Sequence, residues 1–245
     1  MDPADAEPTP ALPEDPLANV PELHTYLTAD PAERTAALKL VADSIAQMRQ
    51  TANNSLIFHP LNLALFVGVL AVIIRYMINA GHEPFIVGTT CTGLLCIELV
   101  LIRFLTQDYL LAAEEINWAW LGDADMIVTK FGDEVIGTVV VEWVSGEARG
   151  KRKKAWKGEI KAWTVRLRYR RKGVGRALLE EAVKESRKKG AEGIEFQEGH
   201  ANSKRVLPVF YSGKFDKGDR KAREKLQDLL GSSPTKTRRK RGSSG

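Results

Sequence analysis

The stretch that decides the fold is Arg170-Arg171-Lys172-Gly173-Val174-Gly175, which lies between two segments of different periodicity. Residues 158–167 alternate apolar and polar side chains as a strand does, whereas residues 173–189 carry apolar residues at helical spacing. A strand, a glycine turn and a helix start direct several backbone N–H groups at one point. Such a cradle favours a phosphate or pyrophosphate ligand. A plain strand–turn–helix on a basic surface remains the structural alternative.

Length and composition fit one domain with additional segments. The chain has 245 residues and a formal net charge of +5, and its basic residues cluster at 149–157 and 236–241. Such clusters can meet nucleic acid, anionic lipid or an anionic cofactor, or simply face solvent. Cys91 and Cys96 are the two cysteines, too few for a disulfide framework or a zinc site.

The chain ends differ in composition from the middle. Residues 1–22 hold six of the eleven prolines, six acids and no Lys or Arg, which predicts a disordered acidic leader rather than a signal peptide. Residues 231–245 are expected to form a disordered basic tail. Residues 23–55 predict a first strand followed by a helix, because Asp30-Pro31 is typical of a helix start.

Two apolar runs, residues 56–78 and 85–105, are each long enough to cross a bilayer as a helix. The linker of residues 79–84 is short and has no Lys or Arg, so the runs predict a transmembrane hairpin with both termini in the cytosol. Arg75 near the linker opposes this orientation unless it snorkels to the interface. Glu98 lies deep in the second run, where an acid marks either a functional site or a helix–helix hydrogen bond, for instance to Asn62.

The remaining residues, 106–230, predict a mixed α/β domain. A helix is expected over 106–120, and a β-hairpin over 126–131 and 135–144. A strand at 193–197, a short helix at 206–211 and a charged helix at 219–230 follow the glycine turn.

This order of elements, with the Arg-x-x-Gly-x-Gly turn of residues 170–175 after the fourth strand, resembles the GNAT N-acetyltransferase superfamily. The resemblance covers residues 23–215, and the apolar hairpin is similar to that of the membrane-anchored N-acetyltransferase 8-like branch. It implies an α/β (α+β) GNAT acyltransferase fold with a mixed central sheet and an inserted two-helix transmembrane hairpin. It also implies acetyl-CoA as co-substrate, an amine acceptor (small molecule or protein lysine) and an endoplasmic reticulum location in contact with membrane lipid. Nucleic acid is not expected as a partner.

The resemblance assigns the cofactor contacts to the fourth strand and the turn. The strand backbone would pair with the pantetheine arm, and the turn N–H groups would face the pyrophosphate, with glycines permitting close approach. The implied cofactor-binding residues are Val165, Leu167, Arg170, Arg171, Lys172, Gly173, Val174, Gly175 and Arg176.

The resemblance also suggests catalytic residues. Glu159 is the expected general base, with Glu142 as the alternative, and Tyr211 is the expected acid for the leaving thiolate. Pairing of Glu159 with a lysine and a core position for Tyr211 are the competing interpretations. The segment after Asn202 departs from the family, because Gly213-Lys214-Phe215 replaces its Gly-Phe pair and its last two strands are not evident. A catalytically degenerate GNAT-fold protein with a binding or regulatory role therefore stays open, as does a basic membrane protein that binds anionic lipid.

Overall fold

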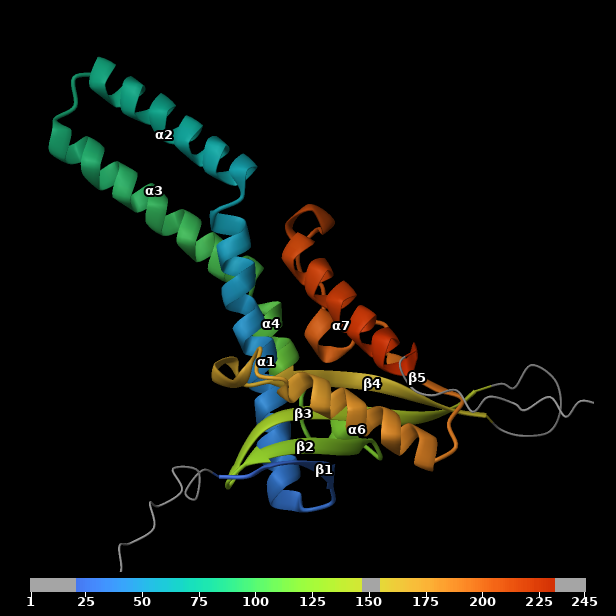
Figure 1. Ribbon diagram of the computed structural model, residues 1–245. Helices are drawn as coiled ribbons and strands as arrows, with labels where there is room; N and C mark the ends of the chain where they lie inside the picture. Colours follow the sequence, from blue (N-terminus) through green and yellow to red (C-terminus); the bar gives the residue numbers. More distant parts are fainter. Residues whose placement is uncertain (1–20, 147–154, 232–245) are drawn as a thin grey trace, which may run out of the picture.

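The computed structural model describes residues 21–146 and 155–231. A five-stranded sheet with helices on both faces forms the domain, and a long helical hairpin projects from one end of it (Figure 1). The expectations for the acidic leader, the basic tail and most of the 149–157 cluster fall outside the described residues.

The sheet is mixed, as expected. Its strands lie side by side in chain order, β1 to β4 antiparallel and β5 parallel to β4. Their bounds are β1 (Leu23–Thr28), β2 (Asp125–Phe131), β3 (Glu134–Gly146), β4 (Ala155–Val165) and β5 (Gly193–Phe196). The fourth strand is shorter at its end than predicted. Leu167 belongs instead to the 3-10 helix η1 (Leu167–Tyr169), which starts the turn.

Helices cover both faces of the sheet. Val139 and Ile160 are buried in the core under α6 (Val174–Lys188). Helix α7 (Gly213–Gly231) adds buried residues to the same core. Val140 and Ala162 are buried on the opposite face, in the core beneath α1 (Pro31–Ile57) and α4 (Asp108–Glu114). Full burial of each valine or isoleucine of this set contributes roughly 1.5–3 kcal/mol. The sheet beneath the glycine turn is therefore packed on both faces.

Strand β4 leaves its neighbour β5 part-way along its length. The two strands pair only from Lys157 to Ile160. At the same level, the β3–β4 register shifts, because Val140 opposes Ala162 whereas Val141 opposes Ile160. Lys161 is therefore an extra residue, and a bulge of this kind bends a strand and increases its twist. The last residues of β4 consequently face an opening instead of a strand.

The apolar runs form two helices that stand away from the domain (Figure 1). These are α2 (Pro60–Asn79) and α3 (Pro84–Leu105), each with proline in its first turn, a position that lacks an intrahelical partner anyway. Helix α1 extends to Ile57 and buries Leu56, so the first span starts later than residue 56. Met77 and Ile102 are the buried residues of α2 and α3, respectively.

Two helical segments differ from expectation. The predicted helix over 106–120 divides into α4 and the single turn α5 (Trp118–Leu121), because the Asn117 side chain accepts a hydrogen bond from the Trp120 N–H and starts a new helix. After β5 the chain forms the 3-10 turns η2 (Ala201–Ser203) and η3 (Val209–Tyr211). Helix α7 then begins six residues before the predicted 219. No strand follows β5 in the part of the chain that the structure describes.

Glu33 ties the start of α1 to the sheet. Its carboxylate accepts hydrogen bonds from the Tyr26 hydroxyl at 2.6 Å, the Thr28 hydroxyl at 2.5 Å and the Lys130 ammonium at 3.0 Å. The Thr28 bond is the main cause of a lowered pKa for Glu33, the Tyr26 bond acts in the same direction, and desolvation opposes both.

We expect this network to make folding stability depend on pH. A carboxyl whose pKa is lowered by folding stabilises the native state above its ordinary pKa, and the stabilisation is lost as the pH falls through the folded-state pKa. Glu33→Gln should therefore lower the free energy of unfolding by about 1–3 kcal/mol at pH 7. The difference should shrink in acid, as followed by thermal melts from pH 7 to pH 3. Exposed Glu114→Gln is the control; a Glu33→Gln deficit of constant size across this range would contradict the prediction.

Candidate active site

A cleft of about 670 Å³ opens where β4 and β5 separate. This volume is within the range of small-molecule sites. The β4 edge and the glycine turn form one side of the cleft, and α1 and α7 form the other. Its lining includes Ser44, Gln47, Met48, Trp163, Val165, Leu167, Arg170, Gly173, His200, Asn202, Phe215 and Lys225.

The free edge of β4 offers backbone groups to this cleft. Arg166 N–H donates to Ile136 on β3, and because strand groups alternate sides, Trp163 and Val165 turn theirs away from β3. Trp163 N–H donates to the Asn202 side chain at 3.2 Å, and Val165 C=O accepts from Arg170 Nε at 2.9 Å. The Trp163 C=O and the Val165 N–H are left without an acceptor or donor among the described residues. An extended ligand can pair with these two groups as an added strand would.

Leu167 does not continue this edge. Its carbonyl accepts the Arg170 N–H within the turn, at 3.2 Å. The expected strand-like pairing therefore applies to Val165 and not to Leu167, whose residue still lines the cleft.

The glycine turn forms the cradle that its sequence predicts. Arg171 and Gly173 both adopt left-handed backbone conformations, with φ of 65° and 88°. Backbone N–H groups of residues 171–175 have no acceptor within the described residues, whereas the N–H groups of Arg176 and Ala177 already donate to Gly173 O. The cradle is thus one residue shorter than expected. Its position at the N-terminus of α6 adds the positive end of the helix dipole.

Glycine is favoured at positions 173 and 175 of the turn for different physical reasons. A Cβ at Gly173 would meet nothing within 4 Å, so the left-handed φ is what favours glycine there. A Cβ at Gly175 would lie 2.9 Å from Trp163 Cζ2, and the Trp163 indole donates to Gly175 O at 3.1 Å. Gly175 therefore permits helix-to-strand packing, rather than only the close ligand approach expected from the sequence.

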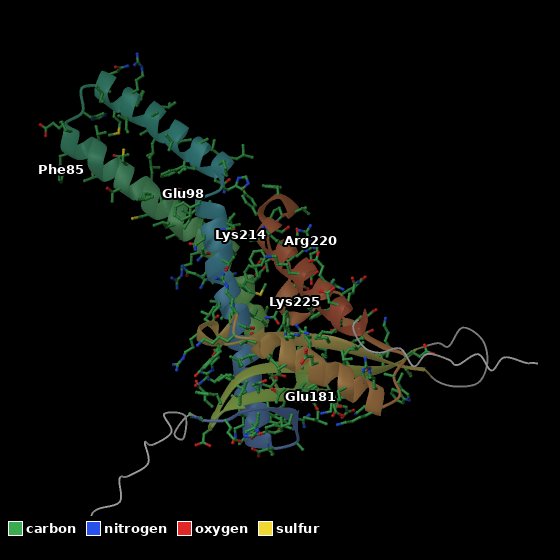
Figure 2. All side chains as sticks on the ribbon, viewed as in Figure 1. Phe85, Glu98, Glu181, Lys214, Arg220 and Lys225 are labelled. Carbon is green, nitrogen blue, oxygen red and sulfur yellow. The ribbon has the colours of Figure 1, made fainter. Side chains whose placement is uncertain are left out.

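Basic side chains surround the cradle. Partial burial lowers the pKa of Arg170 from its ordinary value, although a guanidinium remains charged in proteins. Arg171 and Arg176 line the cleft beside it, and α7 adds Lys214 and Lys225 from the other side (Figure 2). The sequence did not identify the two α7 lysines, because nothing in a charged helical pattern says which face meets a turn about 45 residues earlier.

Glu159 lies in the middle of a row of three carboxylates. It is opposite Glu142 on β3 and opposite Glu195 on β5. Because the adjacent Ile160 is buried on the α6 side, these carboxylates point to the other face of the sheet. Glu142 pairs with Lys161 at 3.4 Å and Glu195 pairs with Lys157, but Glu159 has no ion pair or hydrogen bond within the described residues. It sits one residue before the strands separate.

Tyr211 does not reach the cleft. Its hydroxyl donates to Asn62 Oδ1 at 2.5 Å at the start of α2, and its ring packs against His59 with centroids 4.8 Å apart. This arrangement does not favour the acid role expected for it. The same contact occupies Asn62, so Glu98 lacks the suggested partner and makes no hydrogen bond to any described residue.

His200 lines the cleft although sequence reasoning did not single it out. It is 5% exposed, and its Nε2 lies 3.1 Å from Asp219 Oδ1 on α7. Burial is the main cause of a lowered pKa for His200, and the Asp219 carboxylate partly opposes it. Its burial beside Asp219, a carboxylate that also pairs with Arg223 at 3.1 Å, is a tertiary property that no local sequence signal reports.

Residues 98–210 match the family model for the acetyltransferase (GNAT) family. The matched segment contains β2 to β5, the glycine turn and α6. No curated protein matches the chain. The segment starts inside α3, so the match includes the end of the apolar hairpin but not α2.

Solved acetyltransferase structures resemble the chain at low identity. An acetyltransferase from Trypanosoma brucei is 14% identical, with 72% of this chain and 82% of that one covered and a TM-score of 0.35. An aminoglycoside acetyltransferase from an uncultured soil metagenomic sample, in complex with sisomicin, is 13% identical (45% and 61% covered, TM-score 0.31). A ribosomal-protein-alanine N-acetyltransferase from Brucella melitensis biovar Abortus 2308 is 14% identical (30% and 50% covered, TM-score 0.28). The chain spans only 50% of the Brucella structure's sequence and 61% of the sisomicin complex's sequence, so the substrates of those proteins do not transfer to it.

Proposed function

We propose that this chain, supported as a member of the GNAT acetyltransferase superfamily by the match over residues 98–210, transfers an acetyl group from acetyl-CoA to an amine. The observation that carries the proposal is the set of unpaired N–H groups of residues 171–175 beside the free edge of β4. A pyrophosphate and an extended pantetheine arm need these two features next to each other.

The cleft suits acetyl-CoA in charge as well as in shape. The pyrophosphate would accept hydrogen bonds from the N–H groups of residues 171–175, and Arg171, Arg176 and Lys225 would balance its charge. The pantetheine amides would pair with the Trp163 C=O and the Val165 N–H. Asn202 would release the Trp163 N–H, which could then hold the thioester carbonyl and stabilise the oxyanion as the amine attacks.

The chemistry is a direct attack. The cysteines Cys91 and Cys96 both lie in α3, and none lines the cleft, so no cysteine is placed to carry the acyl group. The amine nitrogen bonds to the thioester carbon, the C–S bond breaks, and CoA leaves as a thiolate that takes a proton from solvent. Glu159, whose carboxylate has no ion pair or hydrogen bond to a described residue, accepts the proton lost by the amine, directly or through a water.

The hairpin anchors the enzyme in a membrane. Helices α2 and α3 contain windows with mean hydropathy of 2.2 and 2.1, long and apolar enough to cross a bilayer by length and composition. Phe85 lies at the end of the hairpin far from the domain, and Glu98 lies further along α3 towards the domain (Figure 2). Arg103 lies at the domain end of α3, so the positive-inside rule places the domain and both termini in the cytosol. The resemblance to the membrane-anchored branch favours the endoplasmic reticulum.

A catalytically degenerate protein that binds CoA is the second candidate. Two observations favour it: β5 ends the sheet without a further strand in the described residues, and Tyr211 contacts the hairpin instead of the cleft. The acceptor side would then lack part of its wall.

Gly173→Ala should weaken acetyl-CoA binding at least tenfold, because alanine disfavours the left-handed φ that directs the turn N–H groups. Gly190→Ala is the matched control, since Gly190 has a φ of 67°, also has open space around its Cβ, and lies outside the cleft. Isothermal titration of the full chain in detergent gives both affinities. Equal binding by the two variants, or no binding by the wild type, would refute the cofactor proposal.

Glu159→Gln should lower turnover roughly 100-fold or more without changing acetyl-CoA affinity, because the amide cannot accept the proton. Release of free CoA thiol with a panel of amines measures the rate. Glu195→Gln, one strand away in the same row, is the matched control and should retain activity. Loss of turnover in the Glu142→Gln variant and not in the Glu159→Gln variant would assign the role of base to Glu142. Absence of turnover with every amine of the panel would favour the degenerate protein.

The full chain should stay in the membrane fraction after alkaline carbonate extraction, with its linker on the far side. In a Cys91→Ser, Cys96→Ser background, Lys217→Cys should react with an impermeant maleimide on sealed microsomes. His82→Cys should react only after permeabilisation, because it lies in the linker. Extraction of the chain into the soluble fraction, or labelling of both positions on sealed vesicles, would contradict the anchoring.

A further inference from the structure

A second cavity, of about 500 Å³, lies where α1, α3 and α4 meet. We propose that it binds a phospholipid with an anionic headgroup at the cytosolic surface of the membrane; this rests on the proposed anchoring. The cavity adjoins the acyl-donor cleft only at Gln50, and the proposed acetyl transfer does not use it.

The polar side of the cavity carries two guanidinium groups, of Arg49 and Arg103, that have no acidic partner in the described ranges 21–146 and 155–231. Arg49 Nη2 donates to Arg103 O at 3.0 Å and its Nε to the Thr106 hydroxyl at 3.4 Å, so Arg49 closes the end of α3. This capping role uses the Arg103 carbonyl but needs neither the Arg103 side chain nor a cavity. The Arg103 side chain makes no ion pair or hydrogen bond to the described residues, and it is exposed. An anion between the two guanidiniums would receive charge-assisted hydrogen bonds.

Amide side chains add donors on the same side. Asn53 Oδ1 accepts from the Thr106 hydroxyl at 2.7 Å, which leaves its Nδ2 without an acceptor in the described part of the chain. The Gln50 side chain has no hydrogen bond to a described residue either and lines the cavity beside Asn53. A phosphate diester with further headgroup oxygens would use these donors as well as the two arginines.

The other side of the cavity is apolar and lies deeper along the hairpin. Leu99 and Val100 line it from α3, and Leu99 lies about 6 Å along the helix axis from Arg103, towards the bilayer centre. Arg103 itself is two residues from the end of the helix at Leu105, at headgroup level. This order, apolar inside and cationic at the interface, matches an acyl chain joined to an anionic headgroup, and basic pockets beside membrane helices favour such lipids.

For the test, the full chain is incorporated into nanodiscs that contain phosphatidylcholine with 30% phosphatidylserine and is then purified from them. Native mass spectrometry counts the lipids that the protein retains. The wild type should retain phosphatidylserine over phosphatidylcholine. Arg103→Gln should lose at least threefold of the retained phosphatidylserine, with an unchanged melting temperature. Arg75→Gln, on α2 near the opposite end of the hairpin, is the matched control and should behave as the wild type.

Other outcomes separate the alternatives. Displacement of phosphatidylserine by inorganic phosphate would assign the arginines to a free anion and overturn the lipid proposal. Equal retention of both lipids, or equal losses in the Arg103→Gln and Arg75→Gln variants, would also overturn it. If the chain resists alkaline extraction yet shows no lipid preference, only this inference fails; if it extracts as a soluble protein, the anchoring itself fails and the lipid proposal with it.

Discussion

The separation of β4 from β5 after Ile160 is the constraint on which the candidate site depends. Backbone hydrogen-bonding groups that lose a strand partner must find another partner or face water. Here Asn202 takes the Trp163 N–H and Arg170 takes the Val165 C=O, so the open edge is only partly satisfied by the protein. The remaining groups are available to a ligand of extended shape. Without that separation, the turn of residues 171–175 would be an anion site beside a closed sheet, with no place for a thioester.

Local patterns predict much of this architecture. The alternation in residues 125–146, the apolar spacing of α6 and the length of the apolar runs each depend on neighbours in sequence, and all five strands occur where expected. The glycine turn also follows from its sequence, because left-handed φ values restrict the residue type. The end of β4 is the exception, since the turn takes Leu167 into a 3-10 helix that closes on Arg170.

Long-range contacts account for what sequence reasoning missed. Gly175 is small because an indole from β4 packs on it, which only the folded helix and strand reveal. The family resemblance assigns Tyr211 to the reacting centre, but its hydroxyl donates to Asn62 on the hairpin. His200, just before η2, and Lys225 on α7 reach the cleft because these two elements dock beside it. The charged sequence of α7 does not identify which face of the helix meets the cleft. The row of Glu142, Glu159 and Glu195 depends on strand register, which includes a bulge.

Helix α1 joins the two parts of the molecule as one continuous rod. It covers the sheet, contributes Ser44 and Gln47 to the cleft, and ends at Ile57 next to the first apolar helix. Gln47 and Ile57 are separated by ten residues, or about 15 Å along a helix axis. With the hairpin in a bilayer, this rod sets a nearly fixed standoff between the lipid surface and the reacting centre. A dissolved amine can enter the cleft whatever that distance is. An amine attached to the membrane can react only if its attachment is long enough to span it.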